Sequence, residues 1–346
     1  MKKLLLTLDY ELFGDGSGDV FKHIVEPTNS ILEVAERYGA KITVFFEVVE
    51  YWCLKHEWES GNHMGYDNNP VEAMEKQVVD MIRRGHDVQL HLHPQWVDAK
   101  WVDNHWEVDY KNWRLSDFNS SIMTLKQLIS KGKHTLEGII QQHFPAYDCY
   151  ALRAGGYNAQ PSEAIVEALR ECGMRVDTSI VPGAIEQGAL SRYDYSTSPS
   201  DMGKWFVDVK LEEPSKENTD IIELPIVSFP IVRLFKFMSI TRIKSIMLNH
   251  KSAKASFTAK TSSGGTRGGI IRKISFFFKK EFQTWDYCLF PCWMHRYFLH
   301  KISKQKSREI FVLIGHPKSL VSIKNLEFML KEVKDKMKFA ILSDLT

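Results

Sequence analysis

Short apolar runs alternate along the chain with longer amphipathic segments. The first apolar run spans residues 3–8, and a later one at 42–46 predicts the next strand. Between them the pattern predicts a helix over 27–38, because Pro27 is tolerated at a helix start and Gly39 favours a helix end. Strands and helices that alternate in this way indicate an α/β fold built on a parallel sheet or barrel.

The alternation continues to the end of the chain. Further helices are predicted at about 70–84, 120–144, 162–172 and 323–334, and further strands at 87–93, 151–153, 175–177, 221–224, 310–314 and 339–342. No internal repeat interrupts this order. At 346 residues the chain is long enough for one large α/β domain or for two smaller ones.

Two of the predicted strands carry pairs of polar side chains. Asp9 and Glu11 lie two residues apart on the first strand, and His91 and His93 lie two residues apart on a later one. Successive side chains on a strand point to opposite faces, so each pair shares one face while the neighbouring leucines take the other. Carboxylates and imidazoles at the ends of apolar strands are the ligands of hydrolytic zinc or iron sites. We therefore predict a metal-dependent hydrolase.

Composition narrows the class of protein. No stretch reaches the roughly 18 apolar residues of a transmembrane helix, and the apolar start of the chain ends at Asp9, too early for a secretion signal. We therefore expect a cytoplasmic protein, peripheral at most to the inner face of the membrane. The five cysteines form an odd set without a CxxC pair, which predicts neither a disulfide framework nor a thiolate zinc site.

The formal net charge of +2 hides an uneven distribution. Residues 230–280 hold twelve Lys or Arg and no Asp or Glu, around a Ser- and Gly-rich stretch at 261–269. One interpretation is a solvated, partly flexible insertion; the other is a surface for anionic lipid-linked glycans or for a membrane. Nucleic acid is not expected as a partner, because no recognised binding motif accompanies the charge.

Five short motifs follow one another along the chain: Thr7-Leu8-Asp9-Tyr10-Glu11, Thr43-Val44-Phe45-Phe46, the segment from Gly85-His86-Asp87 to His93-Pro94, Arg153-Ala154-Gly155-Gly156-Tyr157, and Leu313-Ile314-Gly315-His316-Pro317. In this order they resemble the polysaccharide deacetylase family, whose members share the NodB homology domain. The resemblance implies a distorted, incomplete (β/α) barrel with its active site at the C-terminal ends of the strands. Residues 1–229 and 306–346 would form this barrel, and 230–305 would be a basic, partly flexible insertion.

The chain departs from the family pattern at two positions. The usual second aspartate of the first motif falls on Tyr10, and the usual second histidine, four residues after the first, falls on Gln95. Glu11 and His93 would then have to substitute, which the strand geometry permits. This variant resembles the Asp-Tyr-Glu type of deacetylase associated with bacterial surface-polysaccharide (O-antigen) biosynthesis.

Amide hydrolysis suggests a role for each group. We predict Glu11, His91 and His93 as ligands of a divalent metal, with Zn²⁺ expected and Fe²⁺, Co²⁺ or Ni²⁺ as alternatives. Asp9 is the predicted general base, although it could exchange roles with Glu11. Arg153 would hold the base ionised through a bidentate ion pair.

The remaining candidates complete the predicted site. His316 would protonate the departing amine, and Tyr157 or the backbone N–H groups near Gly155-Gly156 would stabilise the oxyanion. Asp177 either supports Arg153 and His316 or caps a loop. Trp96 belongs to a tryptophan cluster that lines a sugar-stacking cleft or simply packs in the core.

The predicted function is removal of an N-acyl group from an amino sugar of a surface polysaccharide or its precursor. Acetyl is the first candidate for this acyl group. The missing export signal favours the precursor. Two alternatives stay open. One is a catalytically silent glycan-binding or scaffold protein on the same barrel, and the other is a different metal-dependent amide or glycoside hydrolase.

Overall fold

The computed structural model describes residues 1–188, 190–232 and 278–345. Its main sheet contains β1 (Lys3–Tyr10), β2 (Thr43–Glu47), β3 (Asp87–Leu92), β6 (Ala151–Ala154), β7 (Val176–Asp177), β10 (Trp205–Val207), β11 (Ile221–Glu223), β14 (Ile310–Gly315) and β15 (Lys338–Ala340). Their order across the sheet is β10-β11-β7-β6-β3-β2-β1-β14, and β15 also pairs with β1. All pairings are parallel except that of β10 with β11.

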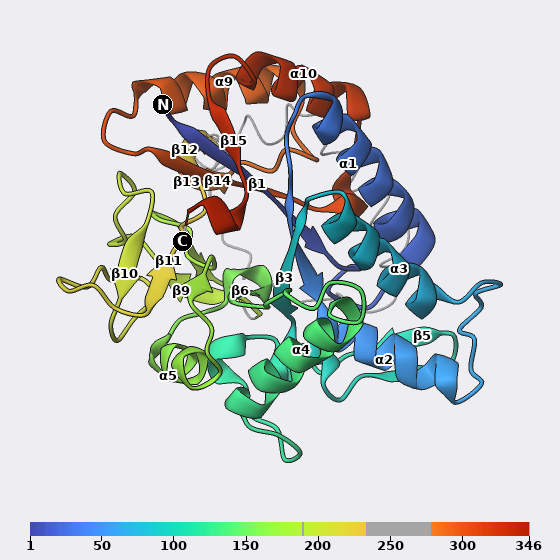
Figure 1. The fold of residues 1–346 in the computed structure, drawn as a ribbon. Helices are drawn as coiled ribbons and strands as arrows, with labels where there is room; N and C mark the ends of the chain where they lie inside the picture. The colour runs from blue at the N-terminus through green and yellow to red at the C-terminus, as the bar shows by residue number, and fades with distance from the viewer. Residues whose placement is uncertain (189, 233–277, 346) are drawn as a thin grey trace, which may run out of the picture.

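Helices surround this curved sheet (Figure 1). They are α1 (Glu26–Arg37), α2 (Val48–Glu59), α3 (Pro70–Arg83), α4 (Leu125–Ile140), α5 (Glu163–Glu171), α9 (Cys292–Lys304) and α10 (Ile323–Val333). An isolated parallel pairing of Ile226 with Val312 brings the chain after β11 against β14, so the sheet curls back on itself without a continuous ladder at that point. The fold is the predicted α/β class, a distorted and incomplete (β/α) barrel.

Among the described residues, three two-stranded ribbons lie outside the main sheet. They pair β4 (Lys100–Val102) with β5 (His105–Glu107), β8 (Ile185–Gln187) with β9 (Arg192–Asp194), and β12 (Ser228–Val232) with β13 (Lys280–Thr284). Residues 233–277 of the predicted basic insertion lie outside the described residues. The described end of that segment forms β13 and α9 and buries Trp285, Tyr287 and Phe298. Its predicted boundaries and flexibility stay predictions.

Two helices differ from the sequence prediction, each for a local reason. The helix predicted from 120 is shorter in the structure, because Thr124 and Gln127 form a capping box that starts α4 at Leu125. The pattern missed α2, whose apolar and aromatic residues fall on all of its sides, so that no helical period is visible.

In the part of the chain that the structure describes, no helix is both long and apolar enough to cross a bilayer.

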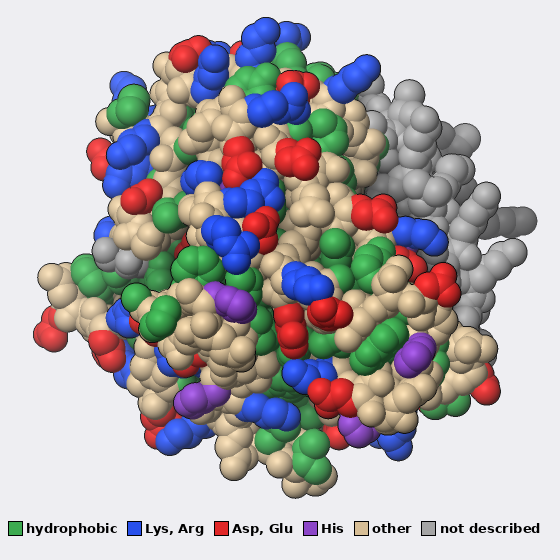
Figure 2. Space-filling model, turned by 45° about the vertical axis from the view of Figure 1, so that its right-hand side comes forward, with side chains coloured by type: hydrophobic (Ala, Val, Ile, Leu, Met, Phe, Trp, Pro, Cys, Tyr) green, Lys and Arg blue, Asp and Glu red, His purple; other side chains and the backbone are tan. Residues whose placement is uncertain are grey.

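The strands are buried on both faces, as expected for a parallel sheet covered by helices. Every residue of β1 from Leu4 to Tyr10 is buried, including the polar ones. Figure 2 shows one face of the molecule, on which Lys and Arg side chains are interspersed with Asp and Glu. Buried charge is therefore the unusual feature of the molecule, and it collects where β1, β2, β3, β6 and β14 end.

Candidate metal centre

Strand β1 brings the two predicted carboxylates to the C-terminal rim of the sheet. Thr7, Asp9 and Glu11 alternate with apolar residues, and Asp9 and Glu11 are 2% and 6% exposed. A buried carboxylate requires a charge partner or hydrogen bonds, because burial otherwise favours its neutral form. The groups that supply these partners define the site.

His91 lies near the end of β3 and is 1% exposed. Its Nδ1 lies 2.8 Å from the carbonyl oxygen of Arg153 and therefore donates a proton to it. Nε2 then carries a lone pair, and this buried atom has no hydrogen-bond partner. It lies 3.5 Å from Oε2 of Glu11 and 3.9 Å from Oδ2 of Asp9, both of which are acceptors. The lone pair of Nε2 thus faces carboxylate oxygens, which cannot donate a hydrogen bond to it. A cation bound between these atoms would satisfy all of them.

His93 follows β3 directly, and its Nδ1 lies between two carboxylates. It is 3.0 Å from Oε2 of Glu11 and 2.9 Å from Oε2 of Glu47. Glu47 ends β2 and was not among the predicted site residues. The only signal in the sequence is a carboxylate directly after the apolar Phe45-Phe46 run, at the end of a parallel strand.

Glu11, Glu47, His91 and His93 form what we call the Glu/His group. One candidate ligand atom from each of the four lies within 4.8 Å of all the others. Imidazole nitrogens and carboxylate oxygens suit Zn²⁺, Fe²⁺ and Co²⁺ alike. Asp9, Glu11 and His316 form a second set that meets the same distance criterion. The donor chemistry and the unpartnered imidazole nitrogen thus fit the predicted divalent metal, without choosing among these ions.

Neighbouring charges shift the pKa values of Glu11 and His93 in this group. Burial alone would raise the pKa of Glu11, but Lys318 and the two histidines outweigh it and hold that pKa well below its ordinary value. Burial alone would lower the pKa of His93, but the carboxylates of Glu11 and Glu47 raise it to about 10. Without an added cation, a protonated His93 therefore neutralises part of the negative charge.

Arg153 pairs with Asp9, as predicted, although through one of its nitrogens rather than two. Nη1 donates to Oδ1 of Asp9 at 2.6 Å and to Oγ1 of Thr7 at 2.8 Å. Nε and Nη2 donate to the carbonyl and hydroxyl oxygens of Thr178. Burial favours the neutral form of Asp9, but Arg153 and the nearby histidines hold its pKa below the ordinary value. Asp9 is therefore ionised, and its Oδ2 faces His91 rather than Arg153.

His316 follows β14 and meets the same carboxylates from the other side. Its Nε2 lies 3.7 Å from Oδ2 of Asp9 and 3.8 Å from Oε1 of Glu11. Its Nδ1 lies 3.0 Å from Oδ2 of Asp286. Burial lowers the pKa of His316, but Asp286 outweighs this and raises it. Asp286 was not predicted, because it lies inside the segment taken as an insertion.

Asp177 lies at the end of β7. It accepts hydrogen bonds from the backbone N–H and the hydroxyl of Ser179. These contacts match the loop-capping alternative, and Asp286 makes the contact to His316 instead. The carboxyl of Glu223 lies beside Asp177, and burial together with that charge raises the pKa of Glu223 well above its ordinary value. A catalytic role of Asp177 stays a prediction.

The two predicted substrate-binding residues lie in different surroundings. Tyr157 is partly buried, has a positive φ of 61°, and follows Gly156, whose φ is also positive. Burial and then the negative charge of Asp9 raise the pKa of Tyr157 well above its ordinary value. Trp96 is 1% exposed and packs edge-to-face on Trp106. Its role in sugar binding stays a prediction.

Lys318 is a further residue that the sequence analysis missed. Its Nζ donates to Oε1 of Glu11 at 2.9 Å and also to the carbonyl oxygen of Leu12. Glu11 thus offers one oxygen to a lysine and the other to the two histidines. In the sequence, Lys318 follows the His316-Pro317 motif by one residue and looks like an ordinary surface lysine.

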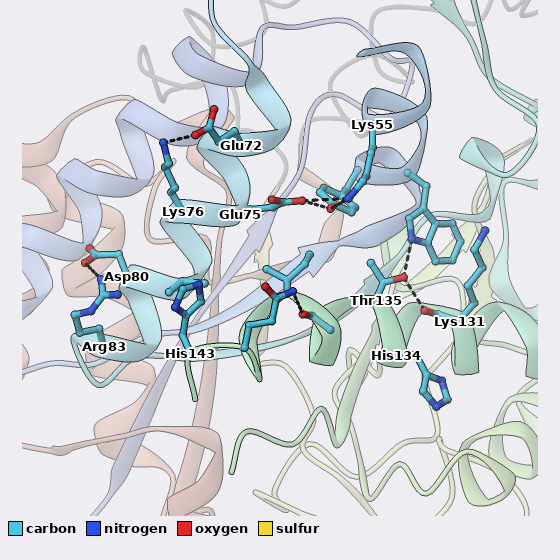
Figure 3. Close-up of a pocket in the computed structure, with 16 residues that line it drawn as sticks. Lys55, Glu72, Glu75, Lys76, Asp80, Arg83, Lys131, His134, Thr135 and His143 are labelled. Atoms are coloured by element: carbon cyan, nitrogen blue, oxygen red, sulfur yellow. Dashed lines mark hydrogen bonds and ion pairs between the residues drawn. The ribbon is translucent and has the colours of Figure 1, made fainter. Parts of the chain in front are cut away.

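A groove of about 950 Å³ lies elsewhere, between α2, α3 and α4. Figure 3 shows three ion pairs among the charged side chains that line it. Lys55 lies 3.4 Å from Glu75, and Arg83 lies 3.2 Å from Asp80. Its lining includes none of the Glu/His group, so the groove adds no group to the candidate centre.

Comparison with known proteins gives a limited result. No family model matches the chain, and no curated protein matches its sequence. Similar solved structures include a Mycobacterium smegmatis protein assigned as a polysaccharide deacetylase (12% identity over 99% of this chain and 88% of that one, TM-score 0.47), the 4-alpha-glucanotransferase of Thermococcus litoralis (11%, 99% and 40%, 0.47) and PuuE allantoinase (10%, 99% and 88%, 0.46). These three names describe different activities, and at such identities the similarity assigns none of them to this chain.

Proposed function

We propose that this chain is a metal-dependent hydrolase that removes an N-acyl group from an amino sugar of a bacterial surface polysaccharide or its precursor. Acetyl is the first candidate for this acyl group. The observation that carries the proposal is the buried, unpartnered Nε2 of His91, which faces the carboxylates of Glu11 and Asp9. Asp9 and His316, whose Oδ2 and Nε2 lie 3.7 Å apart, would supply the base and the acid that hydrolysis of an amide needs.

Glu11, His91 and His93 would hold the cation. When bound, it supplies Lewis-acid polarisation of the acyl carbonyl and a water acidic enough to react near neutral pH. The carbonyl oxygen of Arg153 keeps His91 in the tautomer that has its lone pair on Nε2. The protein thereby orients this ligand before any ion arrives.

Asp9 is suited to take the proton from the attacking water. Arg153 occupies its Oδ1, keeps the carboxylate ionised and leaves Oδ2 directed toward the centre. A base that is buried but ionised can accept a proton when the water adds to the acyl carbon. This assignment keeps Glu11 as a ligand and Asp9 as the base.

His316 is suited to protonate the departing nitrogen. Asp286 accepts from its Nδ1 and favours the protonated ring, so that Nε2 can give up a proton as the C–N bond breaks. The products are then a carboxylate and the free amine of the sugar. Tyr157, or the N–H groups near Gly155-Gly156, would stabilise the oxyanion that forms between these steps.

An amino sugar is proposed as the substrate because the five sequence motifs resemble those of polysaccharide deacetylases. We further propose that the basic segment 230–280 favours an anionic lipid-linked glycan or a membrane surface near the site. Most of that segment lies outside the described residues.

A second candidate is a protein that works without a metal, such as a silent glycan-binding barrel. The ammonium of Lys318 on Glu11 favours it, since this contact and a protonated His93 already balance much of the buried negative charge. The two candidates differ in one measurable property, which is stoichiometric metal.

The first test is metal analysis of protein purified without a chelator or a His-tag. We expect close to one Zn, Fe or Co per chain in the wild type, and its loss in a folded His91→Ala/His93→Ala variant. Wild-type protein should then release free acetate from N-acetylated amino sugars. Absence of stoichiometric metal, even after incubation with Zn²⁺, Co²⁺ and Fe²⁺, would reject the hydrolase and favour the second candidate.

A further inference from the structure

We infer that Glu47 is a fourth protein ligand of the cation, so that the centre consists of two carboxylates and two imidazoles. This inference rests on the proposed function, because it extends the ligand set of the same centre. Glu47 has no exposed surface and ends β2, next to the strand that carries the histidines.

The spacing of the Glu/His group fits one shared ion. Oε2 of Glu11 lies 3.0 Å from Nδ1 of His93 and 3.5 Å from Nε2 of His91, and Oε2 of Glu47 lies 2.9 Å from Nδ1 of His93. Ligands of one cation with bonds of about 2.1 Å lie roughly 3.0–3.4 Å from each other. These three separations are therefore already close to those that a common ion requires, and the other ligand atoms of the group lie within 4.8 Å of one another.

The orientation of His93 distinguishes two roles for Glu47, an orienting partner of His93 or a ligand of the ion. As an orienting partner, Glu47 would only accept a hydrogen bond from one ring nitrogen of His93, and the other ring nitrogen would bind the ion. That other nitrogen, Nε2, lies against Gly155, where an added Cβ would be only 2.5 Å away from it. The nitrogen that faces Glu11 is Nδ1, which is also the one that faces Glu47.

A nitrogen that binds an ion through its lone pair has no proton left to donate. If Nδ1 of His93 binds the ion beside Glu11, Oε2 of Glu47 loses its hydrogen bond and needs another positive partner. An ion held by Nδ1 would be within reach of that oxygen, since Oε2 of Glu47 lies 2.9 Å from Nδ1. Oε1 of Glu47 accepts from the backbone N–H of Val49 and caps α2, so the carboxylate is held in place by the helix.

Metal affinity tests this inference without any measurement of activity. Binding of Co²⁺ and Zn²⁺ to the full-length protein would be measured by competition with a coloured chelator, together with the visible absorption of bound Co²⁺. The variant is Glu47→Gln, which keeps an acceptor for Val49. The matched control is Glu50→Gln, three residues later in the chain, whose buried carboxylate accepts from Leu12 and lies outside the Glu/His group.

We expect Glu47→Gln to weaken binding about 100-fold or more and to change the Co²⁺ spectrum, since loss of an orienting partner alone costs about 10–100-fold. Glu50→Gln should bind within about threefold of the wild type. In a His93→Ala background, Glu47→Gln should weaken binding further, because a ligand acts without His93 and an orienting partner does not. Glu47→Asp, which keeps the charge and the cap on a shorter side chain, replaces Glu47→Gln if that variant does not fold.

Three results would overturn the inference. The first is a Glu47→Gln effect that disappears in the His93→Ala background, and the second is a Glu50→Gln effect of equal size. Either of these, with metal bound by the wild type and lost in His91→Ala, would leave the proposed function standing. The third is a wild type that binds no metal, which would reject the proposed function together with this inference.

Discussion

Arg153 lies between the core of the sheet and the carboxylate assigned as the base, and it has no exposed surface. We expect Arg153→Met to lower the free energy of unfolding by about 3–5 kcal/mol, because it leaves Asp9 buried without its charge partner. Urea denaturation monitored by circular dichroism measures this loss. Arg175→Met is the control, since its ion pair with Asp148 is half-exposed and should contribute less than about 1 kcal/mol. Equal losses in the two variants would contradict the argument.

His316 and Asp286 act as a unit if the proposed function holds. We expect His316→Gln to lower kcat for an N-acetyl amino sugar by about 10²–10⁴-fold, because the amine then leaves without a proton donor. The loss should be much smaller for an N-acetyl aniline with a good leaving group. Asp286→Asn should fall between His316→Gln and the wild type for both substrates. A loss that does not depend on the leaving group would argue against the role of His316 as the acid.

At the scale of elements, α4 packs on the sheet through one glycine and exposes another. A Cβ at Gly132 would lie 2.9 Å from Leu90 and 3.1 Å from Val48, whereas a Cβ at Gly138 would meet no heavy atom within 4 Å. Gly138→Ala should raise the free energy of unfolding by about 0.5–1 kcal/mol through helix propensity. Gly132→Ala should lower it by about 1–3 kcal/mol through overpacking. Urea titration of both variants checks the pair, and shifts of the same sign would refute the packing argument.

His86 connects α1, β2 and the start of β3. Its Nδ1 accepts from the backbone N–H of Ile42, and its Nε2 faces Glu36. Burial is the main cause that lowers the pKa of His86 to about 4. The unfolded chain, with a histidine pKa of about 6.5, therefore binds a proton that the folded chain does not. The free energy of unfolding should fall as pH drops from about 6.5 to 4, by up to about 1.4 kcal/mol per pH unit.

The variant His86→Asn checks this pH dependence. Its amide oxygen still offers an acceptor to Ile42, but the side chain does not titrate. Urea denaturation at several pH values should give a weaker dependence for His86→Asn than for the wild type between pH 6.5 and 4. The same slope in both proteins would show that another group causes it.

At the scale of the whole molecule, metal binding and folding should be linked. The ligands come from β1, β2 and β3, so they form a site only in the folded chain. Zinc at 100 times its Kd should raise the free energy of unfolding by about 2.7 kcal/mol, and EDTA should reverse this. The His91→Ala/His93→Ala variant should gain nothing from zinc. A similar gain in that variant would place the binding site elsewhere.

Sequence patterns were enough to predict the α/β class, most strands and helices, and two pairs of polar side chains that each share one face of a strand. These features are local: a buried strand is an apolar run, a helix has a period and caps, and side chains two residues apart on a strand share a face. Asp9 with Glu11 and His91 with His93 were predictable for this reason. Helix α2 was not, because its apolar residues give no period.

Which side chains meet across the strands depends on the tertiary structure. Glu47, Asp286 and Lys318 join the centre through the order of strands in the sheet and the path of the chain after β13, and short-range sequence patterns contain neither. Asp177 hydrogen-bonds to Ser179 in the loop after β7, whereas Asp286 reaches His316. A buried charge is compensated by whichever partner the fold places within a few ångströms, so its partner follows from the topology rather than from its neighbours in the chain.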